Sequence, residues 1–397
     1  MKLSDRTRLI KPSVTLALAA KAQVMRAEGI DLVNFTAGEP DFDTPQRIKD
    51  AAVEALKKGM TKYTDVRGIE PLRLAILEKY RKDYGLKYEK TEVLVSCGGK
   101  HALYNVIQAV IDQGDEVVIP APYWVSYSDM VLLAGGTPRL ARTSEESGYK
   151  ITPEQLKAAL TSKTRAFILN SPCNPTGAAY GRDELAALAR VLERHDCLIL
   201  SDDIYEKIVY DGFRFHSILA IEPKLRERTI IFNSLSKSYA MTGWRVGYVL
   251  GPAAMISAAA NIQSQSTSNA TSIAQAAALE ALTGPQDEIA VMVGEFHKRR
   301  DVIVKRLKGM PGITCFKPQG AFYVFPNVRS LLGKTANGKK LSSASDVVDY
   351  FLTEARVLAV PGEDFGSTEN IRISYATSIE EIEKGCDRIE AALKKLE

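Results

Sequence analysis

The chain has 397 residues, a length that suits two domains or one large domain with a smaller partner. It carries 52 basic and 48 acidic residues, a formal net charge of +4, so composition gives no reason to expect nucleic acid or an anionic membrane as a partner. The basic residues are scattered, and the KRR run at 298–300 fits one exposed helical turn.

The five cysteines, at positions 97, 173, 197, 315 and 386, form no C-x-x-C pair. Their odd number and spacing predict neither a disulfide framework nor a zinc site, so we expect a reducing, cytoplasmic location and no metal. Apolar residues at 14–20 follow a basic stretch, as in a signal peptide, but Asp5 lies in the leader and Lys21 ends the run at once. We interpret this segment as a helix.

Short β-rich runs alternate with helical patterns from residue 92 to residue 251. The predicted strands are EVLVS (92–96), DEVVIPAP (115–122), RAFILN (165–170), CLILSDD (197–203), TIIFNS (229–234) and RVGYVLG (245–251). The helical patterns between them include residues 101–112, 153–160 and 182–195. Strands separated by helices predict an α/β fold with a mainly parallel sheet and helices on both of its faces.

The pattern changes after about residue 293. A long helical pattern (294–308) is followed by a strand (320–326), a polar insertion, another helix, strands near 356–360 and 371–376, and a final helix. This order is typical of an α+β domain. The turn-rich segment 37–45 reads as a crossing between domains, so we expect a large domain at 45–292 and a small domain formed by 1–44 and 293–397.

Lys237 stands out in the segment SLSKSYAMTGWRVGYVLGP (234–252), among small hydroxyl residues between two predicted strands. A lysine in such a place is usually solvated, but it could also be a buried amine held ready to react. We expect it on a loop at a strand end. In parallel sheets, ligands bind at the carboxyl ends of the strands.

Other segments offer both a structural and a functional interpretation. The glycine pair of VSCGGKHALYN (95–105) could be a simple turn or could expose N–H groups to a phosphate. Asp202 and Asp203 could be exposed loop acids or could hold a positive group. Trp124 could be a core residue or could stack on a flat ligand. Arg372, in IRISYA (371–376), could be solvated or, if buried, could bind a carboxylate.

The order and spacing of these segments strongly resemble the fold-type I pyridoxal-phosphate enzymes, and most closely the bacterial aspartate aminotransferase branch of the class I aminotransferases. The segments that carry the resemblance are TAGEPDFDTP (36–45), KYTDVRGIEPLR (62–73), GGKHAL (98–103), NSPCNPTG (170–177), SDDIYE (201–206), SKSYAMTGWRVGY (236–248) and PQGAFYVFP (318–326). The resemblance runs from about residue 11 to residue 378. It implies a mainly parallel seven-stranded sheet and pyridoxal 5′-phosphate as the cofactor.

By this resemblance, Lys237 forms a Schiff base with the cofactor and moves the reacting proton, and Asp202 keeps the pyridine nitrogen protonated. Tyr205 and Asn174 bind the ring oxygen, while Trp124 and Ile204 cover the two ring faces. The phosphate meets Gly99, Lys100, Ser234, Ser236, Arg245 and, from the partner subunit of a homodimer, Tyr63. Arg372 and Gly38 bind the substrate α-carboxylate. The same resemblance predicts cis bonds at Ala121–Pro122 and Asn174–Pro175.

The resemblance implies aspartate and 2-oxoglutarate as substrates, with Lys100 meeting the distal carboxylate and Lys11, Ser13 and Thr15 closing the site. Some members of the branch also aminate prephenate, and another amino acid is a further alternative. Asp203 could serve instead of Asp202. A lyase or decarboxylase on the same scaffold would share these residues, whereas a DNA-binding regulator would need a further domain before residue 11.

Overall fold

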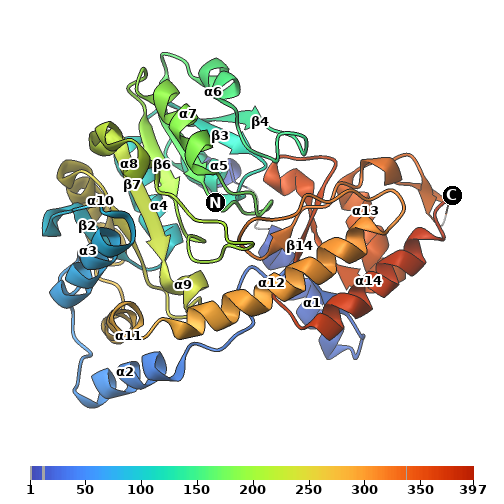
Figure 1. Ribbon diagram of the computed structural model, residues 1–397, viewed down its shortest axis with the longest axis horizontal. Helices are drawn as coiled ribbons and strands as arrows, with labels where there is room; N and C mark the ends of the chain where they lie inside the picture. The colour runs from blue at the N-terminus through green and yellow to red at the C-terminus, as the bar shows by residue number, and fades with distance from the viewer. Residues whose placement is uncertain (1, 11–13, 337) are drawn as a thin grey trace.

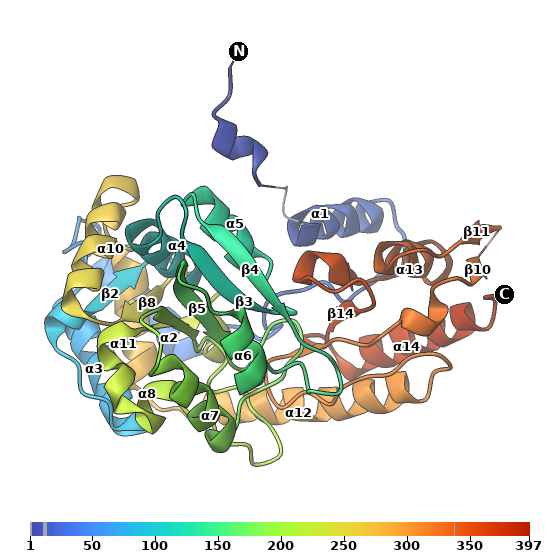
Figure 2. The same cartoon turned by 90° about the horizontal axis from the view of Figure 1, so that it is seen from above.

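The computed structural model describes residues 2–10, 14–336 and 338–397. Figure 1 shows a larger part built on a sheet and a smaller part packed around the end of one long helix, α12 (Asp287–Lys308). The first residues, which include η1 (Asp5–Arg8), lie apart from the body in Figure 2. Within the described residues, no helix is both long and apolar enough to cross a membrane.

The larger part contains a seven-stranded sheet in the order β2-β8-β7-β6-β5-β3-β4. Its strands are β2 (Val93–Ser96), β3 (Glu116–Ala121), β4 (Thr137–Arg142), β5 (Thr164–Asn170), β6 (Leu198–Asp202), β7 (Thr229–Ser234) and β8 (Gly247–Leu250). Only β8 runs antiparallel to its neighbours, which confirms the predicted mainly parallel seven-stranded sheet. The sequence analysis missed β4, because this edge strand is mostly exposed and lacks a run of apolar residues.

Helices cover both faces of the sheet because alternate strand residues point to opposite faces and both sets are buried. Phe167 and Leu169 join the core on one face, and Ala166 and Ile168 the core on the other. The first face is covered by α3 (Glu70–Tyr84), α6 (Pro153–Ala159), α7 (Arg182–Leu192), α8 (Ile218–Ile221) and α11 (Ser272–Thr283), with α2 (Gln46–Lys57) packed on α11. The second face is covered by α4 (Gly99–Val110), α5 (Ser126–Leu133) and α10 (Ala253–Ser266).

The smaller part has its own core, formed by helices and short strands from both ends of the chain. Its elements are α1 (Val14–Ala27), β1 (Val33–Asn34), α12, β9 (Tyr323–Val324), β10 (Thr335–Ala336), β11 (Lys339–Lys340), α13 (Ala344–Tyr350), β12 (Val357–Leu358), β13 (Val360–Pro361), β14 (Ile371–Ser374) and α14 (Ile379–Leu393). β1 pairs with β12 in parallel, and Val33 and Phe35 lie in this core. This pairing supports our proposed division into 45–292 and the two flanking segments 1–44 and 293–397. The residues at 14–20 are helical, as predicted.

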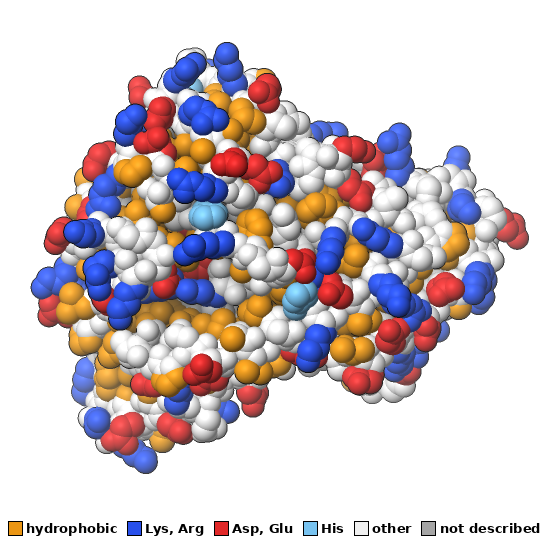
Figure 3. All heavy atoms as spheres, in the orientation of Figure 1, with side chains coloured by type: hydrophobic (Ala, Val, Ile, Leu, Met, Phe, Trp, Pro, Cys, Tyr) orange, Lys and Arg blue, Asp and Glu red, His pale blue; other side chains and the backbone are white. Residues whose placement is uncertain are grey.

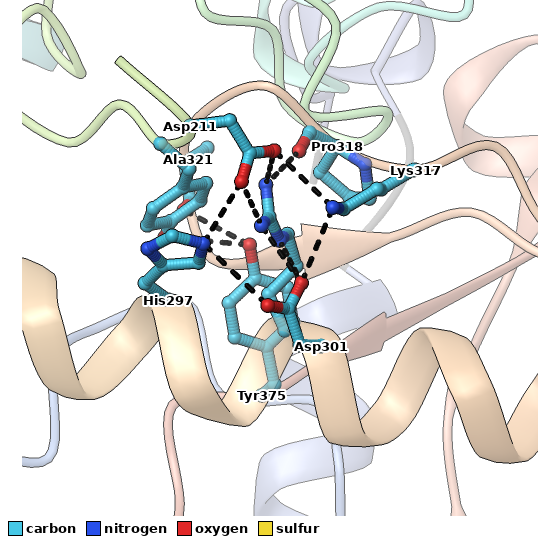
Figure 4. Close-up of polar contacts among 9 residues, drawn as sticks. Asp211, His297, Asp301, Lys317, Pro318, Ala321 and Tyr375 are labelled. Carbon is cyan, nitrogen blue, oxygen red and sulfur yellow. Dashed lines mark hydrogen bonds and ion pairs between the residues drawn. The ribbon is translucent and has the colours of Figure 1, made fainter. Parts of the chain in front are cut away.

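The basic run on α12 is not an exposed turn, contrary to our prediction. Arg299 is 7% exposed and Arg300 fully buried, whereas Lys298 alone faces solvent. Figure 4 shows Asp211 and Asp301 converging in this region with Lys317 and His297. The Arg300 guanidinium donates to Asp211 Oδ2 at 2.7 Å and to Asp301 Oδ1 at 2.7 Å, and its hydrogen bonds hold the pKa of Asp211 far below its usual range. Over the rest of the surface shown in Figure 3, basic and acidic side chains are interspersed.

Replacing Arg300 by methionine should destabilise the protein. The change removes charge-assisted hydrogen bonds worth about 1.5–3 kcal/mol and leaves two half-exposed carboxylates with only Lys317 and His297 as shared partners. We expect the midpoint of thermal unfolding, followed by circular dichroism, to fall by a few degrees. The control is Lys298→Met on the same helix, which should leave the midpoint unchanged. Equal midpoints for wild type and Arg300→Met would contradict this assignment.

Candidate active site

Lys237 lies directly after β7, on the one-turn helix α9 (Leu235–Ser238) rather than on the loop that we predicted. Ser234 caps this turn, because its Oγ accepts a hydrogen bond from Ser236 N at 3.1 Å. The Lys237 ammonium donates to the Gly38 carbonyl oxygen and lies 5.8 Å from the centre of the Phe322 ring. The turn therefore aims the amine toward the crossing segment of the chain, at the junction of its two parts.

The environment of Lys237 favours the neutral amine. Burial lowers its pKa to about 8, and the nearby Arg372 and Arg245 cations act in the same direction, whereas Glu39 opposes them. A substantial fraction of the amine is therefore neutral near physiological pH. An amine with such a pKa can act as a nucleophile or as a general base.

Asp202 ends the central strand β6 and is 8% exposed. Its Oδ2 accepts a hydrogen bond from Tyr127 Oη at 2.5 Å, and its Oδ1 accepts one from Ile204 N at 3.3 Å. Burial raises the pKa of Asp202 to about 6, although the bond from Tyr127 and the charge of Lys237 lower it. The carboxylate is therefore held in a dry site where a cation would be its natural partner.

The neighbouring Asp203 has a different environment. Its Oδ1 accepts from Ser201 Oγ at 2.7 Å, and burial together with the charge of Glu206 raises its pKa strongly. No contact joins it to Lys237 among the residues that the structure describes. Of the two acids that the sequence left open, Asp202 is the one whose charge acts on Lys237.

The amino-terminal end of α4 forms a cradle with Ser234, Ser236 and Arg245. Gly98 has φ +94°, and a Cβ there would come within 2.6 Å of the Arg245 guanidinium. A Cβ on Gly247 would lie 2.2 Å from Gly99 N, so both glycines are required by close approach. Arg245 donates to the Thr242 carbonyl oxygen at 2.9 Å and pairs with no carboxylate in the described part of the chain. Helix N–H groups beside two hydroxyls and a guanidinium that bonds only to backbone carbonyl oxygens suit a phosphate.

Arg372 lies in β14 and is 2% exposed. It donates to Asn174 Oδ1 at 3.1 Å and to the Thr36 carbonyl oxygen at 3.0 Å, while its Nε has no hydrogen-bond partner. Its guanidinium also lies 4.6 Å from the centre of the Tyr323 ring. No ion pair involving Arg372 is found within residues 2–10, 14–336 and 338–397. A buried cation with only neutral acceptors and an orphaned N–H is well suited to receive a carboxylate.

The remaining predicted residues fall into four groups. Trp124 and Ile204 are half-buried and Asn174 and Tyr205 buried near the site, and the Tyr205 Oη lies 3.0 Å from Tyr323 Oη. Lys100 is exposed, and its ammonium lies 5.0 Å from the centre of the Trp124 ring. Tyr63 is 91% exposed and is not brought to this site within the same chain. Lys11 and Ser13 lie outside the described residues, as does the side chain of Thr15.

The structure also adds residues that the sequence analysis did not select. Tyr127 contacts Asp202, and Tyr323 contacts Tyr205. The Thr36 carbonyl oxygen accepts a hydrogen bond from Arg372. The available signals were the motif segments TAGEPDFDTP (36–45) for Thr36 and PQGAFYVFP (318–326) for Tyr323, and for Tyr127 only its nearness in sequence to Trp124. The predicted cis bonds at Ala121–Pro122 and Asn174–Pro175 are confirmed, and Ser171–Pro172 is also cis.

Residues 30–389 match the family described as aminotransferase class I and II, so the chain belongs to this family and is an aminotransferase. It is 52% identical to the aspartate/prephenate aminotransferase of Cereibacter sphaeroides, with 98% of each chain covered, and 48% identical to the aspartate aminotransferase of Geobacillus stearothermophilus, with the same coverage. The crystal structure of the Rhizobium meliloti aspartate aminotransferase matches with a TM-score of 0.97, 45% identity and 100% coverage of both chains. These findings confirm the family and the fold that the sequence predicted.

In protein freed of bound ligand, Asp202→Asn should raise the midpoint of thermal unfolding at pH 8. The folded-state pKa of Asp202, about 6, lies above its ordinary value of 3.8, so the fold disfavours the carboxylate wherever it is ionised. Removing that charge should contribute roughly 2–3 kcal/mol above pH 6, and the gain should fade as the pH drops below 6. The exposed Asp349→Asn is the control. A gain that does not depend on pH would contradict this explanation.

Proposed function

We propose that this chain is an aspartate aminotransferase that uses pyridoxal 5′-phosphate. It would exchange amino groups reversibly between L-aspartate and 2-oxoglutarate, forming oxaloacetate and L-glutamate. The observation that carries the proposal is the position of the Lys237 amine, which lies within electrostatic reach of Asp202, Arg245 and Arg372 at once. The aspartate aminotransferase names of close relatives support the same choice of substrate.

The chemistry of the side chains fits this cofactor. The glycine-lined start of α4, with Ser234, Ser236 and Arg245, offers donors for its phosphate. Asp202 offers a buried carboxylate for its ring nitrogen, and Lys237 an amine for its carbonyl carbon. When bound, the cofactor supplies an electron-withdrawing ring that stabilises negative charge at the substrate Cα.

Each residue then has a role that its environment supports. Lys237, with a pKa of about 8, would move the proton between the substrate Cα and the cofactor carbon C4′. Asp202 holds a proton at the ring nitrogen. Asn174 and Tyr205 donate to the ring oxygen, while Trp124 and Ile204 enclose the ring and exclude water.

Arg372 recognises the substrate α-carboxylate, helped by the Gly38 N–H, because its orphaned Nε and planar fork suit two-point binding. The distal carboxylate is assigned to Lys100, with Lys11, Ser13 and Thr15 closing the site. An ammonium on a flexible stem is a point charge, so it tolerates carboxylates at several distances. That tolerance favours a second activity on prephenate, which the name of the Cereibacter sphaeroides relative also supports.

The proposed enzyme is a cytoplasmic homodimer with two shared active sites. The observation in favour is Tyr63, a large aromatic residue that is 91% exposed on a loop just after α2. We assign its hydroxyl to the cofactor phosphate in the partner subunit. Such a role would explain why a tyrosine stays in solvent within one chain.

Lys237→Ala should abolish the long-wavelength absorbance of bound cofactor and nearly all amino transfer. The variant lacks the amine that both attaches the cofactor and moves the proton. The measurement is a visible spectrum together with the rate of oxaloacetate formation from aspartate and 2-oxoglutarate. Full activity of the variant would contradict the assignment. Transfer of one amino group per 2-oxo acid consumed would separate this reaction from that of a lyase or decarboxylase.

Lys100→Ala should lower kcat/KM for aspartate and glutamate by about 10-fold or more, the effect of losing a charge-assisted contact. Turnover of alanine and phenylalanine should change much less. The control is the exposed Lys298→Ala, because the ammonium of Lys298 pairs with Glu295 on its own helix. Equal losses for all donors would mean that Lys100 supports only the first turn of α4.

A further inference from the structure

Tyr127 contacts two residues that are assigned to the cofactor ring, Asp202 and Trp124. It lies in α5, is 1% exposed, and donates to Asp202 Oδ2 at 2.5 Å. Its ring also meets the Trp124 ring edge to face, with centroids 5.3 Å apart and an interplanar angle of 89°. One side chain therefore touches both the carboxylate assigned to the ring nitrogen and the indole assigned to the ring face.

The hydrogen bond from Tyr127 is the stronger of the two that Asp202 receives. The other, from Ile204 N, is 3.3 Å long. A short O–H···O⁻ bond in a dry site is of the charge-assisted type, which stabilises the ionised form of the acceptor most. No other side chain hydrogen-bonds to the carboxylate of Asp202 in the part of the chain that the structure describes, since the Asn170 amide donates to the backbone carbonyl oxygen of Asp202.

We propose that Tyr127 is a positioning residue that keeps Asp202 ionised, so that the shared proton stays on the ring nitrogen of the cofactor. This inference rests on the proposed function. Asp202 and the ring nitrogen compete for one proton across their contact. A hydrogen bond donated to the carboxylate makes it a weaker base and leaves the proton on nitrogen, where it gives the ring its positive charge. Without that bond, the proton shifts toward Asp202 and the ring becomes a poorer electron acceptor.

The burial of Asp202 makes this contribution necessary. The carboxylate is already a stronger base than usual, because burial raises its pKa even with Tyr127 in place. Lys237 cannot take over the role once its nitrogen is bound to the cofactor in the resting enzyme. Tyr127 is then the side-chain donor that remains beside Asp202 throughout.

The test compares the apoproteins of wild type, Tyr127→Phe and Tyr123→Phe. Tyr123 is a matched control because it lines the same small cavity as Tyr127 and its hydroxyl contacts Ser128 Oγ instead of Asp202. Two ligands are titrated by quenching of tryptophan fluorescence: pyridoxal 5′-phosphate and its analogue in which a C–H group replaces the ring nitrogen. The kcat and KM for aspartate are measured on the reconstituted enzymes.

We expect Tyr127→Phe to bind pyridoxal 5′-phosphate about 10-fold more weakly, the effect of one charge-assisted hydrogen bond, and to bind the analogue nearly as wild type does. It should also lower kcat at least as strongly while changing KM little. Tyr123→Phe should match wild type in all four measurements. Equal losses for the two ligands would mean that Tyr127 only packs, and no loss for either would mean that a water replaces its hydroxyl; either result overturns the proposal. A wild-type protein that binds neither ligand would instead refute the proposed function itself.

Discussion

The active site depends on keeping two buried ionisable side chains, Asp202 and Arg372, near the partly buried Lys237 without letting the three neutralise each other. Lys237, Asp202 and Arg372 come from three different elements, and the guanidinium meets only neutral acceptors. Burial shifts the pKa of the lysine to about 8 and that of the aspartic acid to about 6, so each moves toward its neutral form. Such an arrangement costs stability, and in return it leaves each group able to interact with a ligand.

The architecture makes that cost tolerable. Both faces of the sheet are covered by helices, and a second core holds the smaller part, so a large apolar interior offsets the buried charge. The antiparallel strand β8 has a specific effect. Since it returns beside β7, it brings Arg245, which lies two residues before β8, close to the turn that carries Lys237 and to the first residues of α4. The cradle therefore arises from one reversal in an otherwise parallel sheet.

Much of this fold could be predicted from sequence, for a physical reason. Central strands of a parallel sheet are buried on both faces, so β5 and β7 appear as continuous apolar runs. The edge strand β4 has no such run, and the four-residue turn that carries Lys237 is too short to show a helical period. The candidate site residues were found through motif resemblance, whereas their contacts were not, because Tyr127 and Asp202 are 75 residues apart. The burial of Arg300 was missed for the same reason, since its partner Asp211 lies 89 residues away.

The two adjacent acids at the end of β6 show why contact, rather than residue type, decides function. Asp202 ends β6 and Asp203 follows it directly, but the two carboxylates accept hydrogen bonds from different side chains. Asp202 meets Tyr127 and Lys237, a donor and a cation, which favour the carboxylate. Asp203 instead meets Ser201 and Glu206. Burial and the negative charge of Glu206 both raise the pKa of Asp203, although the hydrogen bond from Ser201 lowers it. Two identical side chains one residue apart therefore have different partners, and only the charge of Asp202 acts on the amine of Lys237.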